Sequence, residues 1–129
     1  MQNQEFDLIF MGQVIEHIQP AAIPEVLAWI RDHLANEGRF IFDTPNRKLT
    51  AIQNPAGYID DDHKIEYTPR QLRKKLSNAG LRVVDETGLL PMPQTLNSGC
   101  FNPLETYEQP LLSPHVEEGY LFAFACTQN

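Results

Sequence analysis

The sequence predicts an α/β fold in which parallel strands are joined by a crossover helix. Two short apolar runs, FDLIFM at 6–11 and RFIFD at 39–43, have the composition of buried strands. Between them, apolar residues recur at helical spacing from Ile23 to Leu34. A strand–helix–strand unit of this length forms a right-handed parallel crossover. The order along the whole chain is strand, helix, strand, loop, helix, strand, long loop, strand.

The first unit has boundaries that the sequence marks. We expect residues 6–11 to be covered on both faces, with Gly12-Gln13 breaking the strand. Gly38 stands where a helix C-cap glycine belongs, and the second strand closes at Thr44-Pro45-Asn46. Trp29 lies at helical spacing with the apolar residues and is expected in the core. Ligands of open α/β sheets bind at the carboxyl ends of strands, which here are Gly12-Gln13 and Thr44-Pro45-Asn46.

The second half of the chain begins with a polar loop over 47–65. Thr68 is a good N-cap, Pro69 suits the first helical position, and Gln71 completes a capping box. The helix that they begin ends at Gly80, and residues 81–86 (LRVVDE) form a strand.

Residues 88–119 form a long connection that contains five prolines. A connection of this length is typical of a functional lid or a substrate-facing excursion. Residues 120–126 (YLFAFAC) have strong β character and form the final strand, in which Cys126 is a small core residue.

Composition predicts a single domain over 1–129 and excludes several classes of partner. The net charge of −7 argues against a nucleic-acid or anionic-membrane surface, because phosphate binding needs clustered Lys and Arg. No apolar run approaches the roughly 18–20 residues that span a bilayer, and 1–10 lacks the pattern of a signal peptide. Two cysteines make neither a disulfide framework nor a metal knuckle, so we expect a cytoplasmic protein.

Four segments of the chain carry a resemblance to one family. They are FDLI followed by VIEHI (14–18), EGRF (37–40), TPN (44–46), and HKIEYTP (63–69) with its following helix. In this order they resemble class I S-adenosylmethionine-dependent methyltransferases, above all the ubiquinone/menaquinone-type and small-molecule or sugar methyltransferases. Glu37 departs from the family pattern, in which glycine or proline is commoner.

The resemblance covers only the carboxyl-terminal half of a methyltransferase domain. It implies a partial Rossmann-like sheet whose strands are equivalent to the family's fourth to seventh, in spatial order 4-5-7-6, with the last strand antiparallel and helices packed on the sheet. The family binds its cofactor with a glycine-rich loop, yet no two of the seven glycines in this sequence are spaced as G-x-G. We therefore expect methyl transfer from S-adenosylmethionine to a small-molecule or sugar-like acceptor as part of a longer enzyme. The chain alone is expected to bind the cofactor poorly and to lack activity.

An open sheet edge follows from the same resemblance. The family's first strand pairs with its fourth, so strand 6–11 presents unpaired N–H and C=O groups. We expect a second copy of the chain, an N-terminal half or a rearranged segment to cover this edge. One alternative is a non-catalytic interaction or dimerisation module derived from the fold. Another is a different α/β enzyme for which the four-segment match is fortuitous.

The resemblance also implies roles for single residues. Gly12 and Gln13 stand where the family's loop passes the methionine end of the cofactor through backbone atoms, although Gly12 also serves simply to break the strand. In similar methyltransferases a histidine at the position of His17 lines the mouth of the active site and assists proton removal. The alternative is that His17 is a surface histidine. Asn46 and His63 are candidates for substrate contact, and Asn46 equally shapes a turn.

A cation site near His63 is the last candidate that the sequence offers. Clustered carboxylates beside an imidazole, as in Asp60–His63, suit a divalent cation. A solvated acidic loop is the favoured interpretation of the same residues, so no metal is predicted.

Overall fold

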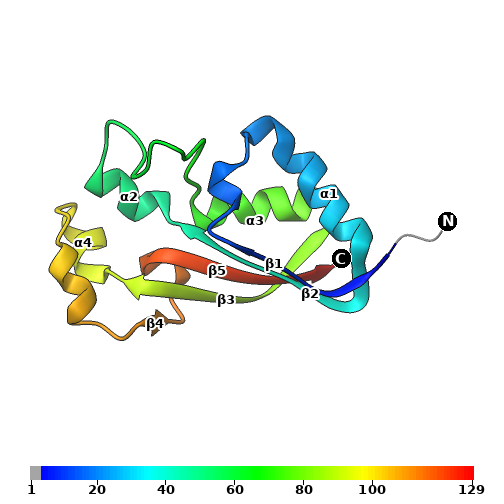
Figure 1. Ribbon diagram of the computed structural model, residues 1–129. Coiled ribbons are helices and arrows are strands. Elements are labelled where there is room, and N and C mark those ends of the chain that lie inside the picture. The colour runs from blue at the N-terminus through cyan, green and yellow to red at the C-terminus, as the bar shows by residue number, and fades with distance from the viewer. Residues whose placement is uncertain (1–3) are drawn as a thin grey trace.

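The sheet formed by the described residues contains five strands in the order β1-β2-β5-β3-β4. The computed structural model describes residues 4–129. Its strands are β1 (Phe6–Gly12), β2 (Leu34–Pro45), β3 (Leu81–Pro91), β4 (Leu112–Ser113) and β5 (Gly119–Gln128). β1 and β2 are parallel, whereas β5 runs antiparallel to both β2 and β3 (Figure 1). The order β1-β2-β5-β3 confirms the predicted 4-5-7-6 arrangement with an antiparallel last strand.

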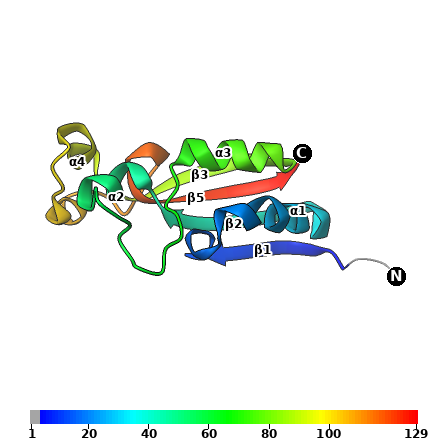
Figure 2. The same cartoon turned by 90° about the horizontal axis from the view of Figure 1, so that it is seen from above.

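Two of the four α-helices described within 4–129 cover one face of this sheet. The helices are α1 (Ile23–His33), α2 (Arg47–Gln53), α3 (Pro69–Asn78) and α4 (Pro93–Ser98). Figures 1 and 2 show α1 and α3 on the same side, with α1 over β2 and α3 over β3 and β5. α2 follows the carboxyl end of β2 and contacts α4. None of the helices within 4–129 is long and apolar enough to cross a membrane.

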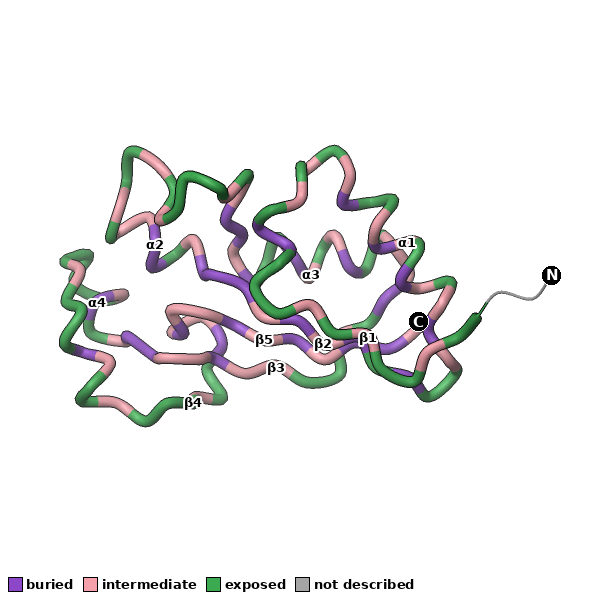
Figure 3. Tube along the Cα trace, viewed as in Figure 1, coloured by how far each residue is buried: buried purple, intermediate pink, exposed green. Residues whose placement is uncertain are grey.

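The core lies between this helical layer and the sheet. Phe40 and Phe42 of β2 and Phe122 and Phe124 of β5 are fully buried there, and Figure 3 shows burial concentrated along these two central strands. Cys126 joins the same cluster, as predicted, and burial raises the pKa of its thiol to about 12.

β1 is not covered on both faces, so that prediction is wrong. Leu8 and Phe10 are 57% and 64% exposed, and β1 pairs only with β2 at the edge of the sheet. Their side chains alternate with Ile9 and Met11, which pack against the core. The apolar run at 6–11 is therefore a strand with one face against the core, one face open and one edge unpaired.

The first helix ends earlier than the apolar spacing predicts. Leu34 already has extended backbone angles (φ −86°, ψ 128°) and pairs with Phe6 of β1. Gly38 consequently lies within β2 and is not a helix cap. A Cβ at Gly38 would meet the Phe6 carbonyl oxygen at 2.8 Å, so close approach of two backbones explains the glycine. Trp29, predicted in the core, is 51% exposed and stacks on the ring of His33.

Two predicted loops contain regular structure. Residues 47–65 include α2, which begins because the side chain of Asn46 caps the Lys48 amide. The connection 88–119 is also shorter than predicted, because β3 pairs with β5 as far as Pro91 opposite Gly119. The remainder holds α4, β4 and the short 3₁₀ helices η3 (Pro103–Tyr107) and η4 (Val116–Glu118).

The capping box of α3 is present as predicted. Thr68 Oγ1 accepts a hydrogen bond from the Gln71 amide, and Gln71 Oε1 accepts one from the Thr68 amide. We expect Thr68→Ala to lower the free energy of unfolding by about 1 kcal/mol, because the Gln71 amide at the start of the helix loses its side-chain acceptor. Urea denaturation measures this change. Ser77→Ala, on the exposed side of the same helix, is the control, and equal losses for both variants would contradict the capping role.

Candidate active site

The turn after β1 is the first part of the site. The backbone of Gln13 adopts a left-handed conformation with φ of 55°, which residues other than glycine rarely adopt. Its amide donates to both the carbonyl oxygen and Oδ1 of Asp43 in β2, at 3.2 and 3.1 Å. Gly12 pairs with Asp43 in the parallel ladder, and both turn residues are exposed. Asp43 thus holds the strained turn at the carboxyl ends of two neighbouring strands.

A buried carboxylate follows this turn in the 3₁₀ helix η1 (Ile15–His17). Glu16 is fully buried, and its Oε2 accepts a 2.8 Å hydrogen bond from Thr44 Oγ1 of β2. Its Oε1 has no hydrogen-bond partner among the described residues. The next side chain, His17, is exposed at the surface.

Backbone hydrogen bonds hold the loop before α3 against η1. The amides of Lys64 and Ile65 donate to the carbonyl oxygen of Glu16, at 2.8 and 3.4 Å. Nδ1 of His17 lies 3.1 Å from the carbonyl oxygen of Asp62. Because a carbonyl oxygen only accepts, Nδ1 carries a proton in this contact, and Nε2 is the atom with the lone pair in the neutral form of His17.

His63 is oriented by a second buried carboxylate, Glu66. Nδ1 of His63 lies 2.7 Å from Glu66 Oε2, which also accepts from the Ile59 amide. The other oxygen of Glu66 accepts from Arg47, at 3.2 Å. Burial raises the pKa of the Glu66 carboxyl, but the hydrogen bonds from His63 and Ile59 outweigh it, so the pKa is lowered overall. Glu66 is therefore ionised and fixes the Nδ1–H tautomer of His63.

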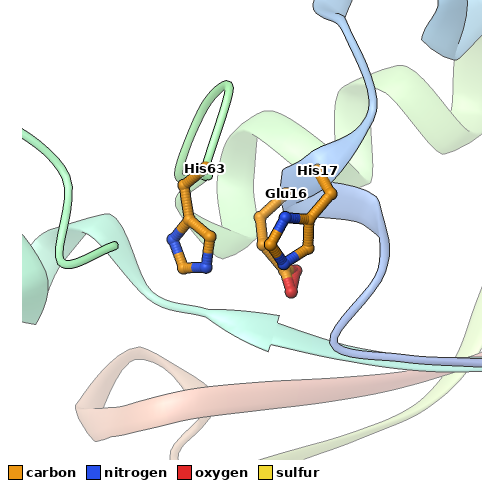
Figure 4. A group of neighbouring side chains, drawn as sticks. All are labelled: Glu16, His17 and His63. Carbon is orange, nitrogen blue, oxygen red and sulfur yellow. The ribbon is translucent and has the colours of Figure 1, made fainter. Parts of the chain in front are cut away.

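The side chains of Glu16 and His17 from η1 and of His63 from the loop before α3 lie close together (Figure 4). One ligand atom of each lies within 4.8 Å of the others, and the two imidazole rings meet edge to face at 4.8 Å. When both histidines are neutral, the cluster brings together two nitrogen lone pairs and the free carboxylate oxygen of Glu16. Such a group can accept a proton from a bound molecule or coordinate a cation.

The side chain of Asn46 makes its hydrogen bonds outside this cluster. It is fully buried, and its Nδ2 donates to the carbonyl oxygens of Glu117 and Gly119. Its Oδ1 caps α2, so every polar atom of the side chain is used within the chain. These contacts favour the turn-shaping role of Asn46 over a contact with substrate.

Of the predicted site residues, the fold gathers Gly12, Gln13, His17 and His63 around the carboxyl end of β1. Two further residues of the site, Glu16 and Glu66, were not predicted from the sequence. The signal for Glu16 was its place directly after the apolar pair Val14-Ile15, where a buried charged side chain needs a partner. The cation site suggested by Asp60–His63 does not include the aspartates, because Glu16 and His17 lie beside His63 instead.

The connection between β3 and β5 lines a separate shallow cavity of about 250 Å³. Leu90, Met92 and Phe101 form much of its apolar wall, and Tyr120 at the start of β5 closes one side. The hydroxyl of Tyr120 donates to Gln53 at the end of α2. Because Gln53 ends the helix that comes directly after β2, the cavity lies near the carboxyl end of β2.

Solved methyltransferases share this fold. A methyltransferase from Thermotoga maritima, described as a possible histamine N-methyltransferase, matches with a TM-score of 0.69 and 15% identity over 100% of this chain and 58% of its own. One from Archaeoglobus fulgidus matches at 0.67 and 14%, over 98% and 61%. The 1,6-didemethyltoxoflavin-N1-methyltransferase of Burkholderia thailandensis, solved with that compound and S-adenosylhomocysteine, matches at 0.59 and 16%, over 100% and 46%. The chain thus spans less than two thirds of each structure.

The strand order and these likenesses define the class: the fold is that of class I S-adenosylmethionine-dependent methyltransferases. A family model described as a methyltransferase domain matches residues 2–86, and the chain belongs to this family. No curated protein matches the sequence.

Proposed function

We propose that this chain forms the acceptor-facing part of a longer methyltransferase, which transfers a methyl group from S-adenosylmethionine to a small-molecule or sugar-like acceptor. The observation that carries the proposal is the gathering of the Gly12–Gln13 turn, His17 and His63 at the carboxyl end of β1. The free cysteines Cys100 and Cys126 are in keeping with a cytoplasmic location, which is part of the proposal.

The residues present fit only one end of the cofactor. The exposed turn at Gly12 and Gln13 offers backbone atoms to its methionine end. No pair of glycines in the sequence is spaced as G-x-G, so the chain supplies no loop of that kind for the nucleotide end. We therefore propose that the chain alone binds the cofactor weakly and lacks activity.

The chemistry required of the side chains is modest. The cofactor supplies a sulfonium that is already a strong methyl donor, so positioning and exclusion of water provide most of the catalysis. In its neutral form, with Nδ1–H donated to the Asp62 carbonyl oxygen, His17 has the Nε2 lone pair with which to accept a proton from the acceptor when methylation requires its loss. The cavity beside Phe101 and Tyr120 supports the connection 88–119 as a cover for an apolar acceptor.

An NMR titration with S-adenosylhomocysteine tests the cofactor proposal. We expect weak binding, with a dissociation constant on the order of 1 mM or higher, that shifts the amide signals of Gly12 and Gln13. Adenosine, which lacks the amino-acid end, serves as the control and should leave both signals in place. Micromolar binding would contradict weak binding by the chain alone. Shifts that avoid both residues would contradict the assigned turn.

A second candidate function is an interaction module that pairs through β1. The observation that favours it is the open edge of β1 with exposed Leu8 and Phe10. A homodimer would pair this edge with its copy, while an N-terminal half of a longer enzyme would cover it within one chain. Light scattering separates the two: a dimer that Phe10→Lys converts to monomer supports the module, and a wild-type monomer contradicts it.

A further inference from the structure

We propose that Glu16, His17 and His63 bind a divalent first-row transition-metal ion through Glu16 Oε1 and the Nε2 atoms of the two histidines. The donors come from η1 and from the loop before α3, and one ligand atom of each residue lies within 4.8 Å of the others (Figure 4). Only a small inward movement of these side chains is needed to reach metal–ligand distances of about 2.0–2.2 Å.

The free oxygen of Glu16 is the independent observation that points to a cation. Glu16 is fully buried, yet Oε1 has no hydrogen-bond partner among the described residues. A buried carboxylate oxygen without a partner destabilises the fold, and a bound cation would remove that cost. The histidines present the nitrogen atoms that would complete the site next to this oxygen.

Each of the three side chains is already oriented by an outer partner. Thr44 Oγ1 donates to Glu16 Oε2, and the Asp62 carbonyl oxygen accepts from His17 Nδ1. Glu66 accepts from Nδ1 of His63, which is the carboxylate–histidine arrangement that supports metal ligands in many proteins. These contacts occupy the other polar atom of each side chain, which leaves both Nε2 atoms and Glu16 Oε1 available as ligands. The cluster is therefore preorganised for coordination.

The donor set selects the class of ion. Two imidazole nitrogens with one carboxylate oxygen suit Zn²⁺ and its first-row neighbours, whereas Mg²⁺ and Ca²⁺ prefer sites built from oxygen. The sequence associates His63 with Asp60–Asp62, which would have suited such a harder ion. Because the fold places His63 beside Glu16 and His17, the site is richer in nitrogen than the sequence indicates.

Three protein ligands leave coordination positions open for a further oxygen. If the proposed methyltransferase function holds, this oxygen is a hydroxyl of the acceptor, whose pKa the ion lowers. With the ion bound, the Nε2 lone pair of His17 is occupied, so the proton leaves to water and His17 acts as a ligand in place of the base role proposed above. The acceptor oxygen forms the bond to the methyl carbon as the carbon–sulfur bond breaks. This role points to an acceptor that is methylated on oxygen.

Titrations with Zn²⁺ by calorimetry and with Co²⁺ by visible absorption, both without S-adenosylhomocysteine, test metal binding separately from the proposed function. We expect one ion per chain and a d–d spectrum of a low-coordinate Co²⁺ site. Glu16→Gln and His17→Gln should each weaken binding by about tenfold or more. His115→Gln, which removes an exposed histidine elsewhere, should leave it unchanged.

Three results would overturn the proposal. The first is the absence of stoichiometric binding to the folded wild-type chain. The second is equal weakening by His17→Gln and His115→Gln, which would indicate adventitious binding to surface histidines. The third is a preference for Mg²⁺ over Zn²⁺, which would contradict the assigned ligands. Because these titrations contain no cofactor, a failed S-adenosylhomocysteine titration would leave the metal site standing.

Discussion

Glu66→Ala is expected to lower the free energy of unfolding by about 3 kcal/mol, because it breaks a buried ionic network. The side chain of Glu66 is fully inaccessible and accepts hydrogen bonds from Arg47, His63 and the Ile59 amide. The variant leaves the Arg47 guanidinium without its carboxylate in a site where that side chain is only 23% exposed. It also leaves the Ile59 amide without an acceptor.

The same variant should weaken metal binding by about 10- to 100-fold, because His63 loses the carboxylate that fixes its tautomer and ring orientation. Urea denaturation and the Zn²⁺ titration measure the two effects on one sample. Glu108→Ala, which removes an exposed glutamate of the same charge, is the control for net charge. If Glu66→Ala unfolds no more easily than this control, the network does not stabilise the fold. Unchanged Zn²⁺ affinity would show that Glu66 does not orient a ligand.

The main elements of the fold could be predicted because their signals are local. The capping box at Thr68 and Gln71 marks the start of α3 without reference to any other segment. The run at 120–126 is β-forming throughout and became the core of β5. The strand order came from the resemblance to methyltransferases, because spacing along the chain does not determine which strands become neighbours.

The errors arose where tertiary contacts override local pattern. Leu34 continues the helical spacing of α1, but pairing with Phe6 draws it into β2. Trp29 lies on the same helix, yet it is half-exposed at the edge of the core, where its ring stacks on His33. α2 was missed because its first turn depends on Asn46, whose side chain also binds Glu117 and Gly119 far along the chain.

The candidate site shows the same division between local and distant information. His17 and His63 could be selected separately from their motifs, and each stands beside a turn at a strand or helix end. Their meeting could not be predicted, because it depends on the Lys64 amide binding the carbonyl oxygen of Glu16. The free Oε1 of Glu16 is a property of the folded chain, so it left no trace in the sequence.

The aromatic contacts between β2 and β5 determine the last and largest expected effect. Phe124→Ala should lower the free energy of unfolding by about 4 kcal/mol, because it leaves a cavity in a closely packed core. The Phe124 ring is fully buried and meets Phe42 edge to face, with 5.6 Å between ring centroids. It also contacts Phe122, and Arg73 lies over its ring at 5.4 Å. Native domains are stabilised by about 5–15 kcal/mol, so this loss is a large part of the total.

Phe10→Ala is the matched control, because it removes the same side chain from a strand of the same sheet at a position that is 64% exposed. It should cost less than about 0.5 kcal/mol, the usual range of surface substitutions, when measured at a concentration where light scattering gives a monomer. Guanidinium denaturation compares the two variants. Similar losses for Phe124 and Phe10 in the monomer would contradict the assignment of Phe10 to the open face of β1, since Phe10 would then be as well packed as the core.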